Sequence, residues 1–98
     1  MHIAFIGFGE AARAFTASLK EAGVETFTAY DIKQGTPAGD DVETAAEELG
    51  VTLRAGPVEA VRGADWIIAA VTAASSLEAA QSVEGGLTGN QVYVDINS

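Results

Sequence analysis

Short apolar runs alternate with amphipathic stretches along the whole chain. Residues 3–6 and 66–71 are almost entirely apolar, which is typical of strands buried on both faces of a parallel sheet. Residues 25–30, 51–53 and 91–96 are rich in β-forming side chains and predict three further strands.

Apolar residues with helical spacing lie between these strands. The apolar face of a first predicted helix, ended by Gly23, is formed by Ala11, Phe15, Ser18 or Leu19, and Ala22. That of a second helix is formed by Val42, Ala45, Ala46 and Leu49. Pro57 opens a short helical turn, and Ser75 with Glu78 predicts a capping box for a helix over about residues 76–83.

This alternation of strands and helices determines the fold class that we expect. It predicts an α/β fold, a Rossmann-type doubly wound parallel sheet of about five strands with helices on both faces. The chain has 98 residues and no linker divides it, so we expect a single domain over residues 1–98.

Composition and charge exclude several functions. The net charge is −9, which repels nucleic acid, and no apolar run approaches the ~20 residues that span a bilayer. The chain contains no cysteine, and no cluster of residues has the spacing of metal ligands, so we expect no metal. We expect a cytoplasmic protein that binds neither nucleic acid nor membrane.

A glycine-rich motif, Gly-x-Gly-x-x-Ala, follows the first predicted strand. Gly7 can turn the chain sharply, Gly9 lets a pyrophosphate approach the backbone, and Ala12 lets the helix pack close to the strand. The N-terminus of the following helix directs free N–H groups and positive dipole charge at the phosphates. The motif therefore predicts a dinucleotide site.

Asp31 ends the second predicted strand, about 20 residues after the motif, where a ribose-binding acid is expected. Its carboxylate would accept hydrogen bonds from ribose hydroxyls and repel a 2′-phosphate, which favours NAD. Lys33 is a nearby cation that could tolerate the phosphate, so NADP stays open. The alternative interpretation is structural: the glycines end a strand and Asp31 caps a loop.

The ends of the fourth and fifth predicted strands should converge on the glycine motif at one edge of the sheet. Val71, Thr72 and Ala73 would then line the ribose–nicotinamide side, although a plain strand-to-helix loop is the alternative. His2 begins the first strand at the opposite edge, and no serine has a histidine partner, so no hydrolytic triad is predicted.

Four segments, IAFIGFGEAARAF, AYDIK, VTAASSLEAA and VDINS, resemble the N-terminal domain of the β-hydroxyacid dehydrogenase group. That group includes 6-phosphogluconate and 3-hydroxyisobutyrate dehydrogenases. The resemblance implies that the pyrophosphate is met by Gly7, Phe8, Gly9, Glu10 and Ala11. It places the adenosine ribose at Asp31, with Ile32 and Lys33 beside it. It places the nicotinamide half at Val71, Thr72 and Ala73, and the substrate at Asn97 and Ser98.

The resemblance also implies an activity for the parent protein. The group transfers a hydride between a small hydroxy acid, sugar acids and their phosphates included, and a nicotinamide cofactor. Its catalytic lysine lies on a later helix of a C-terminal helical domain that mediates dimerisation, and neither Lys20 nor Lys33 matches it. We therefore expect this domain alone to bind NAD (or NADP), to contain no catalytic residue and to lack useful turnover.

Two alternatives to a dehydrogenase domain follow from the same residues. One is a non-catalytic nucleotide-binding or regulatory module, and the other is an intact fold with an empty site. The expected partners are a nicotinamide dinucleotide, a small hydroxy-acid substrate of the whole protein and, through exposed apolar surface, a second copy in a homo-oligomer.

Overall fold

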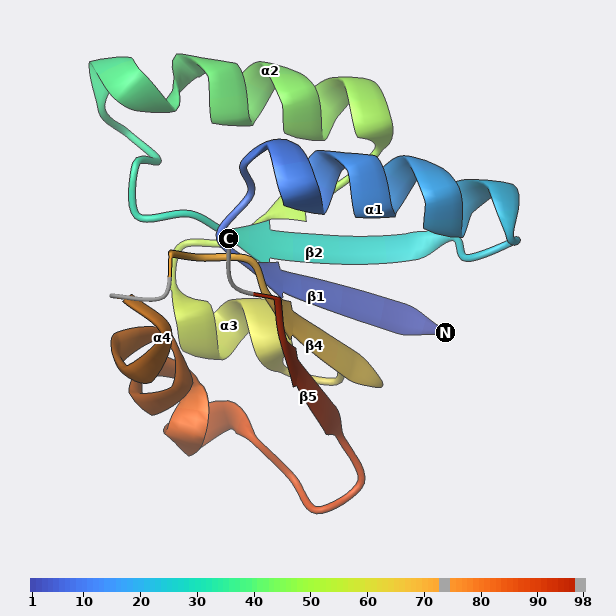
Figure 1. Cartoon of the computed structure of the whole chain (residues 1–98), viewed down its shortest axis with the longest axis vertical. Coiled ribbons are helices and arrows are strands. Elements are labelled where there is room, and N and C mark those ends of the chain that lie inside the picture. The colour runs from blue at the N-terminus through green and yellow to red at the C-terminus, as the bar shows by residue number, and fades with distance from the viewer. Residues whose placement is uncertain (73–74, 97–98) are drawn as a thin grey trace.

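A five-stranded parallel sheet forms the centre of the computed structural model, which describes residues 1–72 and 75–96 (Figure 1). The strands are β1 (His2–Ile6), β2 (Thr26–Tyr30), β3 (Thr52–Leu53), β4 (Trp66–Ala69) and β5 (Val92–Asp95). Their order in space is β3-β2-β1-β4-β5. Because the chain passes from β1 outward to β3 and returns to β4, the order reverses between β1 and β4. The predicted Rossmann-type fold is confirmed.

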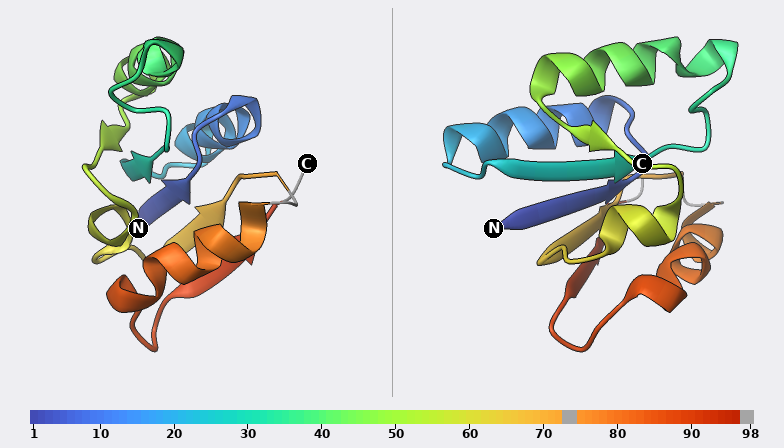
Figure 2. Two further views of the ribbon diagram at one scale, coloured as in Figure 1. Left: turned by 90° about the vertical axis from the view of Figure 1, so that its left-hand side faces the viewer. Right: turned by 180° about the vertical axis from the view of Figure 1, so that it is seen from behind.

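Helices cover both faces of this sheet (Figure 2). One face carries α1 (Glu10–Glu21) and α2 (Asp40–Leu49), and the other carries α3 (Pro57–Val61) and α4 (Ser76–Val83). Two 3-10 turns, η1 (Pro37–Gly39) and η3 (Glu84–Gly86), precede α2 and follow α4. In the described part of the chain, none of these helices combines the length and the apolar character needed to span a bilayer.

Two apolar clusters hold the layers together, one on each side of the sheet. Phe5, Phe8 and Ile68 belong to the cluster beneath α1 and α2, where the rings of Phe5 and Phe8 pack edge to face with centroids 5.9 Å apart. Ile67 and Val83 belong to the cluster beneath α3 and α4. Since both faces of β1 and β4 are buried, their sequences are continuously apolar.

The buried face of α1 differs from the predicted one. Ala12 and Thr16 are fully buried, whereas Phe15 is 43% exposed and Ala11 and Ala22 are exposed. The Thr16 hydroxyl donates to the Ala12 carbonyl oxygen at 2.8 Å, so this polar side chain is buried with its hydrogen bond made. The predicted face was wrong because it followed mainly the apolar residues and left out Thr16.

One buried polar atom, the hydroxyl oxygen of Tyr93 on β5, has no hydrogen-bond partner within the described residues. Burial, reinforced by the negative charge of Asp95, raises the pKa of the Tyr93 phenol above its usual value of 10.0. The unfolded chain therefore loses this proton at lower pH than the folded chain does. The free energy of unfolding should consequently fall as the pH rises past about 10.

Replacing Tyr93 by phenylalanine tests whether the buried hydroxyl lacks a partner and makes stability depend on alkaline pH. We expect Tyr93→Phe to raise the free energy of unfolding by about 1 kcal/mol, because it removes an unsatisfied buried hydroxyl and keeps the ring. The alkaline fall in stability should also become shallower. Urea unfolding measured from neutral to alkaline pH checks both, and a less stable variant with an unchanged pH slope would show that the hydroxyl has a partner.

Candidate functional site

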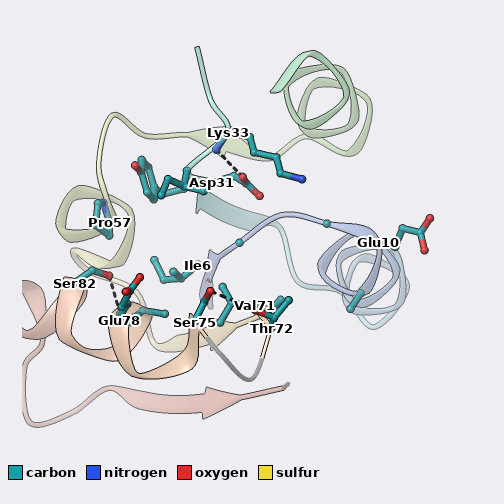
Figure 3. A pocket seen from close by; sticks show the side chains of 17 residues that line it. Ile6, Glu10, Asp31, Lys33, Pro57, Val71, Thr72, Ser75, Glu78 and Ser82 are labelled. Carbon is teal, nitrogen blue, oxygen red and sulfur yellow. Dashed lines mark hydrogen bonds between the residues drawn. The ribbon is translucent and has the colours of Figure 1, made fainter. Parts of the chain in front are cut away.

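A cleft of about 780 Å³ lies at the carboxyl ends of the central strands, where the strand order reverses. Its volume is within the range of roughly 300–1,000 Å³ that small-molecule sites occupy. Figure 3 shows the 17 residues that line it. They come from the glycine loop after β1, the end of β2, the segment after β4, the start of α3 and one side of α4.

Gly7 is required by the protein's own geometry. Its φ is +87°, a conformation that other residues rarely adopt, and an added Cβ would lie 2.5 Å from the carbonyl oxygen of Ala70. Its amide donates to the Tyr30 carbonyl oxygen at 2.8 Å, which ties the loop to the end of β2. This glycine therefore allows β1 to turn tightly between its two neighbouring strands.

The fold itself does not require glycine at position 9. Its φ is −86°, which any residue adopts, and an added Cβ would have no heavy atom within 4 Å. Because Gly9 lines the cleft, that Cβ would project into space that no protein atom uses. The corner that the glycine motif predicts for a pyrophosphate is therefore open.

The first turn of α1 provides the donors for this corner. The first intrahelical bond runs from the Arg13 amide to the Gly9 carbonyl oxygen at 3.1 Å, so the amides before it have no acceptor within the helix. No side chain caps the helix at Gly9. Free N–H groups and the positive end of the helix dipole thus meet an open cleft, which is the arrangement that binds phosphate.

Asp31 connects this loop to the end of β2. One carboxylate oxygen accepts the Phe8 amide at 2.8 Å, and the other accepts the Lys33 amide at 2.9 Å. An ionised carboxylate has about four acceptor positions, so two backbone bonds leave about two for ribose hydroxyls. The structure thus gives Asp31 a loop-holding role that the sequence interpretation did not include, and the ribose role stays compatible with it.

Most predicted cofactor residues line this one cleft, namely Gly7, Gly9, Glu10, Ala11, Asp31, Ile32, Lys33, Val71 and Thr72. Phe8 corrects the prediction: its side chain is fully buried in the core and its amide is bound to Asp31, so it supports the loop from behind. Ala73, Asn97 and Ser98 lie outside the described residues, and their roles stay predictions.

The cleft also contains residues that the sequence interpretation missed. Tyr30 ends β2, Pro57 begins α3, Ser75 directly precedes α4, and Glu78 and Ser82 lie along one side of α4. Ser75, Glu78 and Ser82 follow helical spacing, which was the available signal. Their approach to the glycine loop depends on the packing of α4 against the sheet, which local sequence does not specify.

The predicted capping box at the start of α4 is wrong. The helix begins at Ser76 as expected, but no side chain caps it at Ser75. Instead, the Thr72 hydroxyl donates to the Ser75 hydroxyl oxygen at 3.3 Å. Both hydroxyls thereby stay at the wall of the cleft.

Charged side chains at the cleft are mostly acidic. Asp31 and Glu78 face it together with one cation, Lys33, whereas the Glu10 side chain points away from it (Figure 3). Arg13 does not line the cleft, and its guanidinium donates to the Phe8 carbonyl oxygen at 3.2 Å. Backbone amides and the helix dipole must therefore provide most of the attraction for an anionic ligand.

A family model described as "NADP oxidoreductase coenzyme F420-dependent" matches residues 2–98 of the chain. Among solved structures, a conserved hypothetical protein from Sinorhizobium meliloti 1021 is 32% identical, with a TM-score of 0.88. The similarity covers 99% of this chain and 32% of that one. No curated protein matches the chain.

Two dehydrogenases share the fold at lower identity. Synechocystis arogenate dehydrogenase is 17% identical with a TM-score of 0.83, covering 100% of this chain and 33% of that one. Prephenate dehydrogenase from A. aeolicus, solved with hydroxyphenyl propionate and NAD+, is 16% identical with a TM-score of 0.80, covering 100% and 34%. The chain thus spans about a third of the length of these structures.

Proposed function

Since the chain belongs to the family described as NADP oxidoreductase, coenzyme F420-dependent, we propose that it is the dinucleotide-binding domain of an NAD-dependent dehydrogenase. The nicotinamide, when bound, would supply or accept the hydride. The residues of this domain would bind the cofactor and present its reactive face to a substrate held by the rest of the parent protein.

The open corner at Gly9 is the observation that supports this proposal most directly. Gly7 is explained by the fold alone, but the missing side chain at Gly9 leaves room that the fold does not need. The free amides of the first turn of α1 face that room, and Asp31 lies at the same cleft. A diphosphate bound to the amides and a ribose bound to the carboxylate use both features at once.

The charges of the cleft favour NAD over NADP. A 2′-phosphate would lie close to the Asp31 carboxylate, in a cleft where Glu78 adds a second negative charge and Lys33 is the cation. Repulsion between like charges a few ångströms apart near a protein surface amounts to several kcal/mol. We therefore propose NAD as the cofactor, although the family description names NADP.

The substrate side of the proposal rests on the resemblance to β-hydroxyacid dehydrogenases. The Ile96 amide donates to the Ala69 carbonyl oxygen at 2.9 Å, so the end of β5 stays paired with the end of β4. β5 therefore ends at the same edge of the sheet as β4, the edge that contains the cleft. We propose that a small hydroxy acid contacts Asn97 and Ser98 in the parent protein. Coenzyme F420, named in the family description, is the second candidate for the hydride partner.

Titration with NADH and NADPH tests the cofactor assignment. We expect the unmodified domain to bind NADH about tenfold more tightly than NADPH, because Lys33 offsets most of the repulsion between the carboxylates and a 2′-phosphate. Asp31→Ala should weaken NADH binding about tenfold and remove the preference, because hydrogen bonds to a charged group contribute about 1.5–3 kcal/mol. Isothermal titration calorimetry measures both affinities.

A neighbouring variant serves as the control for this titration. Lys33→Ala keeps the backbone amide that bonds to Asp31, so NADH binding should change little while NADPH binding becomes weaker still. Unchanged NADH affinity in Asp31→Ala would contradict the ribose role. A preference of the unmodified domain for NADPH would contradict the assignment of NAD.

A further inference from the structure

Beyond Asp31 the cleft continues as a slot between α4 and the start of α3. Glu78 and Ser82 face this slot from α4, and Pro57 faces it from the first turn of α3 (Figure 3). None of these residues belongs to the glycine loop or to the ribose-binding position. The slot therefore offers a separate place for another part of the same ligand.

The walls of the slot are apolar. Ile6, Pro57 and Ala79 line the cleft here, and Ile32, with 81% of its surface exposed, stands at the end of β2. Ile32 directly follows Asp31, so a group attached to a ribose at Asp31 would extend along these side chains. Such walls suit a flat, weakly polar ring rather than a phosphate or a sugar.

The two polar side chains that α4 directs at the slot, Glu78 and Ser82, provide hydrogen-bond acceptors. The ionised Glu78 carboxylate can only accept. The Ser82 hydroxyl donates to the Ala79 carbonyl oxygen at 2.7 Å, which uses its one proton and leaves its oxygen to accept. The matching ligand is therefore a flat ring whose edge carries hydrogen-bond donors.

We propose that Glu78 selects the base of the dinucleotide by accepting a hydrogen bond from the exocyclic amino group of adenine. This inference rests on the proposed function and adds a specificity-determining residue to it. A base with an oxygen in place of the amino group would direct an acceptor at the Glu78 carboxylate. Two acceptors cannot share a proton, so that base would be bound less tightly.

Comparison of NADH with its hypoxanthine analogue, in which oxygen replaces that amino group and the adjacent ring nitrogen N1 carries a proton, tests the proposal. We expect the unmodified domain to bind NADH about tenfold more tightly than the analogue. Glu78→Gln should reduce this ratio to about threefold or less, because an amide side chain both donates and accepts. The ratio is the readout, since loss of a negative charge should strengthen the binding of both anionic ligands.

Glu84→Gln is the matched control. It removes the same charge from the exposed turn that follows α4, and Glu84 does not line the cleft, so the tenfold ratio should persist. Circular dichroism of both variants checks that they fold. Equal binding of NADH and the analogue by the unmodified domain, or an unchanged ratio in Glu78→Gln, overturns the role of Glu78 alone. Failure of both dinucleotides to bind overturns the proposed function as well.

Discussion

Gly9→Asp is expected to stabilise the domain and to abolish its dinucleotide binding. Aspartate is a favoured residue at the start of a helix and interacts well with the helix dipole, so the free energy of unfolding should rise by about 0.5–1 kcal/mol. The same carboxylate would occupy the open corner and repel a diphosphate. The affinity for NADH should fall by about a hundredfold or more, because such repulsion amounts to several kcal/mol.

Gly9→Ser separates the loss of affinity caused by filling the corner from the loss caused by the negative charge. Serine is an equally good helix cap, but it is neutral and adds only a small side chain to space that holds no protein atom. We expect its NADH affinity to lie between those of the unmodified domain and Gly9→Asp. Calorimetry and urea unfolding provide the two readouts, and a Gly9→Asp variant that binds NADH normally would show that phosphates do not occupy this corner.

Gly7→Ala is expected to have the largest effect on folding. The substitution combines a φ of +87° with a Cβ placed 2.5 Å from the Ala70 carbonyl oxygen. Ala70 directly follows β4, and its amide donates to the Ile6 carbonyl oxygen at 2.8 Å, so it cannot move away easily. Strain and overlap together should lower the free energy of unfolding by about 3 kcal/mol. This is a large fraction of the roughly 5–10 kcal/mol typical of a domain of this size.

Gly63→Ala is the control for backbone strain alone. Its φ is +76°, but an added Cβ would meet no heavy atom within 4 Å. We expect this change to lower the free energy of unfolding by about 1 kcal/mol. Equal losses for Gly7→Ala and Gly63→Ala in urea unfolding would mean that the contact with Ala70 is relieved by a small shift of the chain.

The parts of the fold that sequence predicts well are those whose burial is nearly complete. β1 and β4 are covered on both faces, so their continuous apolar runs identify them and indicate a parallel sheet. The buried face of α1 was harder to predict. Thr16 satisfies its hydroxyl within its own helix, so its polarity gives no information about which side faces the core.

Sequence likewise predicts one part of the candidate site and misses another. The glycine motif and Asp31 follow a local pattern with a physical reason, and the structure brings them to one cleft. Glu78, Ser82 and Pro57 could not be placed from sequence, because their approach depends on how α3 and α4 pack on the sheet. The bond from the Phe8 amide to Asp31 joins residues 23 positions apart and needs the pairing of β1 with β2.

An NMR titration of the isotopically labelled domain with NADH would locate the diphosphate. Phosphates that bind the first turn of α1 should produce the largest shift changes at the amides of Gly9, Glu10 and Ala11, with smaller changes at Asp31. Changes confined to the opposite edge of the sheet, where the His2 amide bonds to Asp65, would contradict a dinucleotide site at this helix.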